Sequence, residues 1–296
     1  MKKPANITIK DAYELFALDN KARRLTQSTQ AFYRNKVLNF ADWLTGQGVT
    51  LLPDVTSAHI KTFLITLAER NLAGNSQHDY ARAIKTFFRY CVRDELLEKS
   101  PFERVSMPRV EETIPVTLTD DEIRTCLERI SDPRNLVIFQ FILDSGVRAS
   151  ELIALRVGDV EMETGVVTVT QGKGQKDRLT SVGVKTRKGL KRLLIDREHV
   201  TPNSPLFPSY HTGKRLALVG LMHIFRKLQQ ETGIPHLTAH TVRRTMATRM
   251  LRGGMDAYLV SRMLGHADMQ VLRRYAAVDA ELVRKATEDH SVVDNL

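Results

Sequence analysis

The chain has 296 residues, enough for one large domain or two of ordinary size. It is 42% hydrophobic and 26% charged, which is the composition of a globular protein that buries a core. The 44 Lys and Arg residues exceed the 34 Asp and Glu residues and give a formal net charge of +10. This charge favours a polyanionic partner, most simply nucleic acid, and the alternative is an inert basic surface.

The cysteine count and the hydropathy pattern exclude several protein classes. Two cysteines, Cys91 and Cys126, cannot form a disulfide scaffold, and their apolar neighbours indicate small core residues. No apolar run approaches the roughly 18 residues of a membrane span. The N-terminal stretch MKKPANITIKD lacks the apolar core of a signal peptide. We therefore expect a cytoplasmic protein with no membrane partner.

The first hundred residues predict four helices. The first covers residues 9–18, and a polar, basic break at DNKARRLTQ separates it from a second helix at about residues 28–45. The third begins near Thr56. Gly74 and Asn75 break the pattern, and the fourth helix starts near Ser76.

The fourth helix carries one apolar face and one basic face. Three of its basic side chains lie mostly off the apolar stripe: Arg82, Lys85 and Arg89. Such a face is either simply solvated or contacts DNA. The basic composition of the chain favours DNA contact for these three residues.

A proline-containing stretch then marks a domain boundary. Prolines at 101, 108 and 115 and the lack of apolar periodicity predict a helical domain at residues 1–106, a linker at 107–117 and a second domain at 118–296. The second domain opens with TDDE, in which Thr119 and Glu122 have the spacing of a helix capping box.

The second domain mixes helices with a small sheet. The apolar run LVIFQFILDSG predicts a buried helix. The β-branched residues near 166–170, the GKG turn and residues near 178–182 predict two antiparallel strands, and mostly helical sequence follows from Lys185 onward. The predicted fold is therefore mainly α with a small antiparallel β-sheet, in two domains: a four-helix N-terminal domain and an α+β C-terminal domain.

Five places in the second domain carry side chains suited to phosphodiester chemistry. They hold Arg148, Lys173, His240 with Arg243, His266 and Tyr275. Arginine forks bind phosphate oxygens, a lysine of lowered pKa protonates a leaving oxygen, and a tyrosine near cations acts as a nucleophile.

Each of these side chains also has an ordinary explanation. Arg148 pairs with Glu151 at i,i+3 as a helix salt bridge, Lys173 is a turn lysine, and Tyr275 is a packing aromatic. His240 and Arg243 share one helix face, where a capping or salt-bridge role is the alternative. The histidines between positions 211 and 266 match no zinc spacing, so we expect no metal.

Taken together, the motifs resemble the tyrosine recombinase (phage integrase) family, closest in layout to its Xer-like and transposon-encoded members. SGVRASELIALRVGDV is similar to the first-arginine box, QGKGQKDR to the β-hairpin lysine motif, LTAHTVRRT to the H-x-x-R box and LGHADMQVLRRY to the nucleophile segment. STQAFYRNKVLNFADWL resembles part of the helical core-binding domain.

The resemblance implies a role for each candidate. Tyr275 is the nucleophile, Arg148 and Arg243 bind the scissile phosphate, and Lys173 is the leaving-group acid. His240 assists as acid or base and His266 donates a hydrogen bond. The chain departs from the family pattern at Arg244, where histidine is common, and at Val271 and Leu272, where threonines are common.

The same resemblance implies a site-specific recombinase that clamps double-stranded DNA at the nucleoid. It cleaves through a 3′-phosphotyrosyl intermediate, needs neither ATP nor a cofactor and acts as a synaptic tetramer, with or without an accessory protein or second recombinase. A type IB topoisomerase and a non-catalytic DNA-binding protein of the same fold are the alternatives. The target sequence and the biological role, whether resolution, integration or inversion, stay open.

Overall fold

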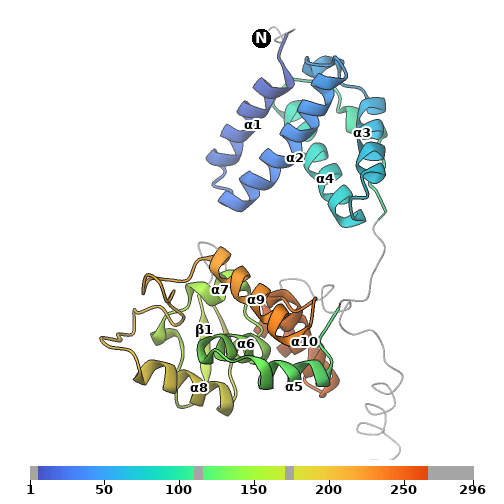
Figure 1. The fold of residues 1–296 in the computed structure, drawn as a ribbon. Coiled ribbons are helices and arrows are strands. Elements are labelled where there is room, and N and C mark those ends of the chain that lie inside the picture. The colour runs from blue at the N-terminus through green and yellow to red at the C-terminus, as the bar shows by residue number, and fades with distance from the viewer. Residues whose placement is uncertain (1–5, 110–115, 171–176, 266–296) are drawn as a thin grey trace, which may run out of the picture. The chain divides into compact units, whose positions relative to one another are not determined.

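The computed structural model describes residues 6–109, 116–170 and 177–265. The chain divides into two compact units, Met1–Thr113 and Ile114–Leu296, each with its own core (Figure 1). The described residues are mainly helical and contain one two-stranded antiparallel sheet, which confirms the predicted fold class.

Residues 6–109 of the first unit form four α-helices and two short 3₁₀ helices. They are α1 (Ile9–Ala22), α2 (Gln27–Gly46), η1 (Leu52–Asp54), α3 (Ser57–Glu69), α4 (Gly74–Arg93) and η2 (Pro101–Arg104). Each of α1, α2 and α3 begins after a threonine whose hydroxyl accepts a backbone N–H of the first turn. The four predicted helices are therefore present.

Two predicted boundaries in this unit are wrong. The first helix continues to Ala22 because Asn20 is buried against the core and Asp19 pairs with Arg93 of α4 at 2.6 Å. These tertiary contacts outweigh the polar local sequence. The fourth helix starts at Gly74 itself, directly after Ala73, so this glycine opens the helix instead of breaking the pattern.

The side chains of α4 separate into a buried face and an exposed face, as the sequence predicts. Seven of its residues are buried: Ala81, Ala83, Ile84, Phe87, Phe88, Tyr90 and Cys91. Arg82, Lys85 and Arg89 are exposed. The buried face packs in an aromatic core in which Phe16 contacts Phe87 and Phe40 contacts Phe88.

The described residues of the second unit contain further helices and the sheet. They are α5 (Asp120–Arg129), α6 (Pro133–Ser145), α7 (Ala149–Ala154), η3 (Val157–Asp159), β1 (Val166–Val169), β2 (Arg178–Ser181), α8 (Val184–Ile195), α9 (Leu218–Thr232), α10 (Ala239–Arg252) and α11 (Ala257–Leu264). The two strands pair with Val167 opposite Thr180. The predicted capping box forms at the start of α5, between Thr119 and Glu122.

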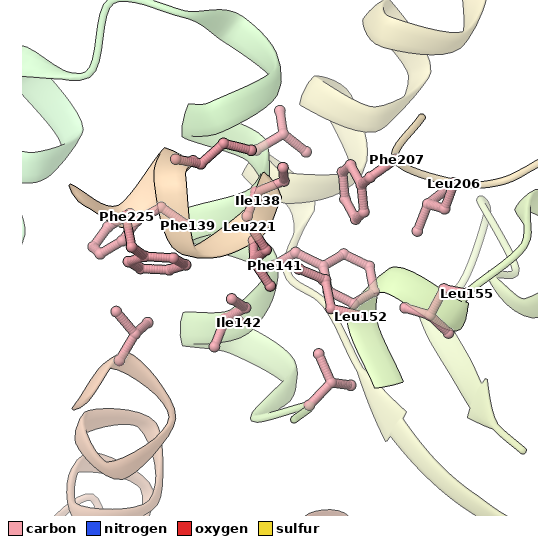
Figure 2. Close-up of a cluster of buried hydrophobic side chains, with 14 of the residues drawn as sticks. Ile138, Phe139, Phe141, Ile142, Leu152, Leu155, Leu206, Phe207, Leu221 and Phe225 are labelled. Atoms are coloured by element: carbon pink, nitrogen blue, oxygen red, sulfur yellow. The ribbon is translucent and has the colours of Figure 1, made fainter. Parts of the chain in front are cut away.

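Helix α6 lies in the core of this unit and packs against α8 and α10. It is apolar on most sides, as expected for a helix that is covered by protein all round. Figure 2 shows its side chains Ile138 and Phe141 among Phe207 and residues of α7 and α9. The predicted buried helix is confirmed.

Gly146 ends α6 in a left-handed conformation, with φ of 63°. A Cβ atom at this position would lie 2.9 Å from both Leu264 Cδ2 and Met246 Sδ. Glycine is therefore required twice, for its backbone angle and for the close approach of α10 and α11. The turn leads directly to Arg148, the residue before α7.

We predict that Gly146→Ala destabilises the protein more than Gly233→Ala does. Both glycines end helices at positive φ, but a Cβ at Gly233 meets nothing within 4 Å. The left-handed backbone angle lowers the free energy of unfolding of each variant by about 1–2 kcal/mol. Overpacking lowers that of Gly146→Ala by about 1–3 kcal/mol more. Urea unfolding measures both changes, and equal losses would contradict the close packing described for Gly146.

Candidate active site

Arg148 occupies the turn between α6 and α7 and leaves 39% of its side chain exposed. Its backbone N–H donates to Glu151 Oε2 at 2.6 Å, and its Nη1 donates to Glu151 Oε1 at 2.8 Å. The helix salt bridge considered as an alternative therefore exists. The guanidinium nevertheless remains accessible to an anion from solvent.

Glu151 is shared by arginines from three different elements. Arg178 of β2 binds it with a fork of two hydrogen bonds of 2.8 and 2.6 Å, in addition to the bonds from Arg148. Nη1 of Arg243, on α10, lies 3.8 Å from Glu151 Oε2. Burial by itself would raise the pKa of Glu151, but the hydrogen bonds and charges of Arg178 and Arg148 outweigh it and lower the pKa to about 2. The carboxylate is therefore ionised at neutral pH.

Arg243 is almost completely buried, with 6% of its side chain exposed. Its Nη1 donates to the Gly146 carbonyl and its Nη2 donates to the Leu264 carbonyl at 2.7 Å. One arginine of α10 thus connects the end of α6 with the end of α11.

The C-terminal end of α11 receives one arginine on each of three successive carbonyls. Arg178 Nε donates to Met263 at 2.8 Å, Arg243 donates to Leu264, and Arg148 Nη2 donates to Gly265 at 3.3 Å. Such carbonyls have no partner inside their helix and carry the negative end of the helix dipole, so cations stabilise them. His266 follows this end directly in the sequence.

His240 lies in the first turn of α10, one helical turn before Arg243. Burial lowers its pKa below 6.5, and the positive charges of Arg244, Arg243 and Arg148 lower it further. The imidazole is therefore neutral at neutral pH and able to accept a proton. Arg244, where the family often has histidine, contributes to this shift.

The structure brings together three of the six predicted catalytic residues: Arg148, His240 and Arg243. They come from the turn before α7 and from α10. Glu151 binds Arg148 and lies 3.8 Å from Arg243, and the charges of both arginines act on His240. Lys173, His266 and Tyr275 lie outside the described residues.

Sequence reasoning missed Arg178, which completes this cluster. The strand alternation contained a signal for it, because Arg178 and Thr180 are on the buried face of β2 while Leu179 and Ser181 are exposed. A cation on the buried face of a strand requires an anionic partner. That partner, Glu151, is 27 positions away and is found only in the folded chain.

The three DNA-contact candidates on α4 form an exposed basic strip in the first unit. Arg82 pairs with Asp79 at 3.0 Å and lies over the Phe32 ring, while Lys85 and Arg89 line a cavity together with Phe102. The Arg82 pair is exposed and contributes little to stability. All three cations are therefore accessible to a polyanion.

The described ranges 6–109, 116–170 and 177–265 also bear on metal binding and membrane insertion. Within them, no three His, Cys, Asp or Glu side chains gather in a way that would hold a metal ion. In the same ranges, no helix combines the length and hydropathy that crossing a membrane requires. Both cysteines are free thiols in the cores.

The sequence matches two family models. The model described as the phage integrase family matches residues 117–281, and the phage integrase N-terminal SAM-like domain matches residues 13–98.

Relatives and solved structures agree with the two models. The tyrosine recombinase XerC of Roseiflexus castenholzii is 30% identical over 271 residues, which covers 88% of this chain and 86% of the relative. The tyrosine recombinase XerD of Pseudomonas aeruginosa is 28% identical over 264 residues, which covers 86% of this chain and 88% of the relative. A structure of the Tn1549 transposon integrase with transposon right-end DNA shares the fold, with a TM-score of 0.77 and 19% identity. The match covers 97% of this chain and 100% of the integrase chain.

The chain belongs to the phage integrase family, whose members are the tyrosine recombinases. It is a site-specific DNA recombinase, an enzyme that cleaves and rejoins DNA strands.

We predict that Glu151→Gln destabilises the protein at neutral pH but much less in acid. The pKa of Glu151 is about 2 in the folded state and about 4.3 when unfolded, so its stabilising contribution is complete above the unfolded value and is lost as pH falls toward 2. Removing one partner of a buried pair costs about 3–5 kcal/mol at neutral pH. Urea unfolding from pH 7 to pH 2.5 measures the difference.

The matched control is Glu163→Gln, which removes an exposed carboxylate paired with Lys191 at 2.7 Å. We expect this variant to differ little from the wild type at every pH, because exposed pairs contribute little. A loss in Glu151→Gln that is equally large at pH 7 and pH 2.5 would contradict the role assigned to the ionised carboxylate.

Proposed function

We propose that Tyr275 is the nucleophile of strand cleavage and that Arg148 and Arg243 bind the scissile phosphate. The observation that carries the proposal is a partly exposed arginine fork, Arg148, fixed beside a buried arginine and a neutral histidine. This is the electrostatic environment in which negative charge on phosphate oxygens is stabilised as the transition state forms.

In the proposed reaction the Tyr275 oxygen forms a bond to phosphorus while the bond from phosphorus to the 5′ oxygen breaks. His240, neutral at physiological pH, accepts the tyrosine proton, and Lys173 gives a proton to the departing 5′ oxygen. His266 donates a hydrogen bond to a nonbridging oxygen. The phosphotyrosyl bond conserves the free energy of the phosphodiester, so a 5′-hydroxyl from a second strand reverses the steps without ATP.

The two units take different parts of this task. Residues 1–106 form the core-DNA-binding domain, residues 107–117 the linker and residues 118–296 the catalytic domain. The exposed cations Arg82, Lys85 and Arg89 contact the DNA backbone from the first domain. Positive charge in both units supports a clamp around the duplex, and affinity then falls steeply with salt through counterion release.

The substrate is a double-stranded recombination site, and strand exchange between two sites requires a synaptic tetramer of this chain at the nucleoid. The Tn1549 integrase and other neighbours of the same fold are described in complex with DNA, which supports the first part. The proposal allows an accessory protein or a second recombinase, and the presence of both XerC and XerD among the relatives supports the second recombinase.

We predict that Tyr275→Phe binds duplex DNA normally but forms no covalent adduct with a nicked suicide substrate. The phenyl ring keeps the shape of the side chain but lacks the oxygen that forms the bond. Denaturing gel electrophoresis separates the covalent protein–DNA adduct from free protein, and a gel shift measures binding.

Tyr258→Phe is the matched control, since Tyr258 is an exposed tyrosine of α11. It is expected to form as much adduct as the wild type. Adduct formation by Tyr275→Phe would remove Tyr275 from its role, and supercoil relaxation by a protein that never joins strands from two sites would contradict the exchange step.

A further inference from the structure

Arg178 has every nitrogen of its guanidinium engaged within the protein. Its Nη1 and Nη2 donate to the two oxygens of Glu151 at 2.8 and 2.6 Å, and its Nε donates to the Met263 carbonyl at 2.8 Å. Only 6% of the side chain is exposed. The bidentate pair with Glu151 therefore directs the fork of Arg178 at a carboxylate inside the protein.

The contacts of Arg178 nevertheless lead directly to the groups that bind phosphate in the proposed function. Through Glu151 it reaches Arg148, which donates to the same Oε1 atom. Through Met263 it fixes the end of α11, whose next two carbonyls are held by Arg243 and Arg148. Arg178 therefore joins β2, α7 and α11 at one point.

The charge of Arg178 determines how much of the charge of Arg148 is available to a ligand. Glu151 is an ionised carboxylate within hydrogen-bond distance of Arg148, and it attracts this arginine strongly in a poorly solvated site. With Arg178 on both oxygens, the carboxylate already has a full counter-charge. Without Arg178, Arg148 becomes its principal counter-ion, and binding phosphate would then require separating that pair.

We propose that Arg178 is a positioning residue for strand cleavage: by neutralising Glu151 and fixing the end of α11, it keeps Arg148 and Arg243 directed at the scissile phosphate. This inference rests on the proposed function of that arginine pair. It assigns to Arg178 an effect on the rate of cleavage that is separate from its effect on folding.

A double-mutant cycle tests the proposal, with single-turnover cleavage of a nicked suicide substrate at saturating protein as the readout. Arg178→Met keeps the length of the side chain and removes its charge. We expect cleavage to slow by about 100-fold, a loss comparable to removal of one transition-state donor, while the Kd for DNA changes less than about threefold because phosphate contacts elsewhere persist.

Adding Glu151→Gln removes the carboxylate that competes for Arg148. The double variant Glu151→Gln/Arg178→Met is therefore expected to cleave at least about tenfold faster than Arg178→Met alone. A residue that acted only through packing would give no such recovery. If Arg178→Met does not fold, Arg178→Lys is tested in its place, because lysine keeps the charge but not the fork. We expect Arg178→Lys to cleave about tenfold more slowly than the wild type.

Arg134→Met is the matched control for the loss of a buried arginine. Arg134 is also buried in the second unit, where it donates to the Pro208 carbonyl and lies over the Tyr210 ring, away from Glu151. It is expected to lower stability and leave the cleavage rate unchanged.

Wild-type cleavage rates in folded Arg178→Met or Arg178→Lys would overturn the inference, and so would a double variant no faster than Arg178→Met. These outcomes differ from failure of the proposed function, in which the unmodified chain itself would form no adduct through Tyr275.

Discussion

One largely buried carboxylate organises the catalytic unit. Glu151 accepts hydrogen bonds from Arg148 and Arg178 and lies 3.8 Å from Arg243, so a single negative charge holds together cations from three separate elements. Three arginines this close would repel one another in a poorly solvated site unless an anion lay among them. The protein supplies one of those anions itself, and the end of α11 supplies the partial negative charges of its carbonyls. In the proposed function, a DNA phosphate adds a further anion to this assembled cluster.

The core explains why these groups meet with so little freedom. Helix α6 is covered by α8, α10 and the residues shown in Figure 2, and it ends at Gly146, where no side chain fits. The carbonyl of that glycine binds Arg243, and the next turn carries Arg148. The hydroxyl of Thr180 on β2 donates to the Ser145 carbonyl at 2.7 Å, which fixes the strand of Arg178 beside the same helix end. Packing thus sets the positions of the arginines, and Glu151 sets their balance of charge.

Local signals in the sequence were sufficient for much of the fold. The four N-terminal helices, the buried α6, the two strands and the Thr119 capping box follow from periodicity, propensity and capping rules, which act over a few residues. The end of α1 was predicted too early because Asp19 is held by Arg93, 74 positions away. A contact between residues so far apart carries no local signature. The start of α4 was placed two residues too late because Gly74, which was read as a break, is the first residue of the helix.

The sequence allowed candidate site residues to be named, but it did not reveal their geometry. Motif resemblance identified Arg148, His240 and Arg243, and the structure brings them together. The resemblance gave no indication that Arg178 neutralises Glu151. Nor did it indicate that three arginines each bind one of the carbonyls of Met263, Leu264 and Gly265. These relations join residues far apart in the chain, so only the folded structure contains them.

The most direct measurement is a crystal structure of the protein with its recombination site, trapped before cleavage. We expect a nonbridging oxygen of the scissile phosphate within hydrogen-bond distance of Arg148, with the fork between Arg178 and Glu151 unchanged. A phosphate held by other side chains, with Arg148 still turned toward Glu151 and the Gly265 carbonyl, would contradict it.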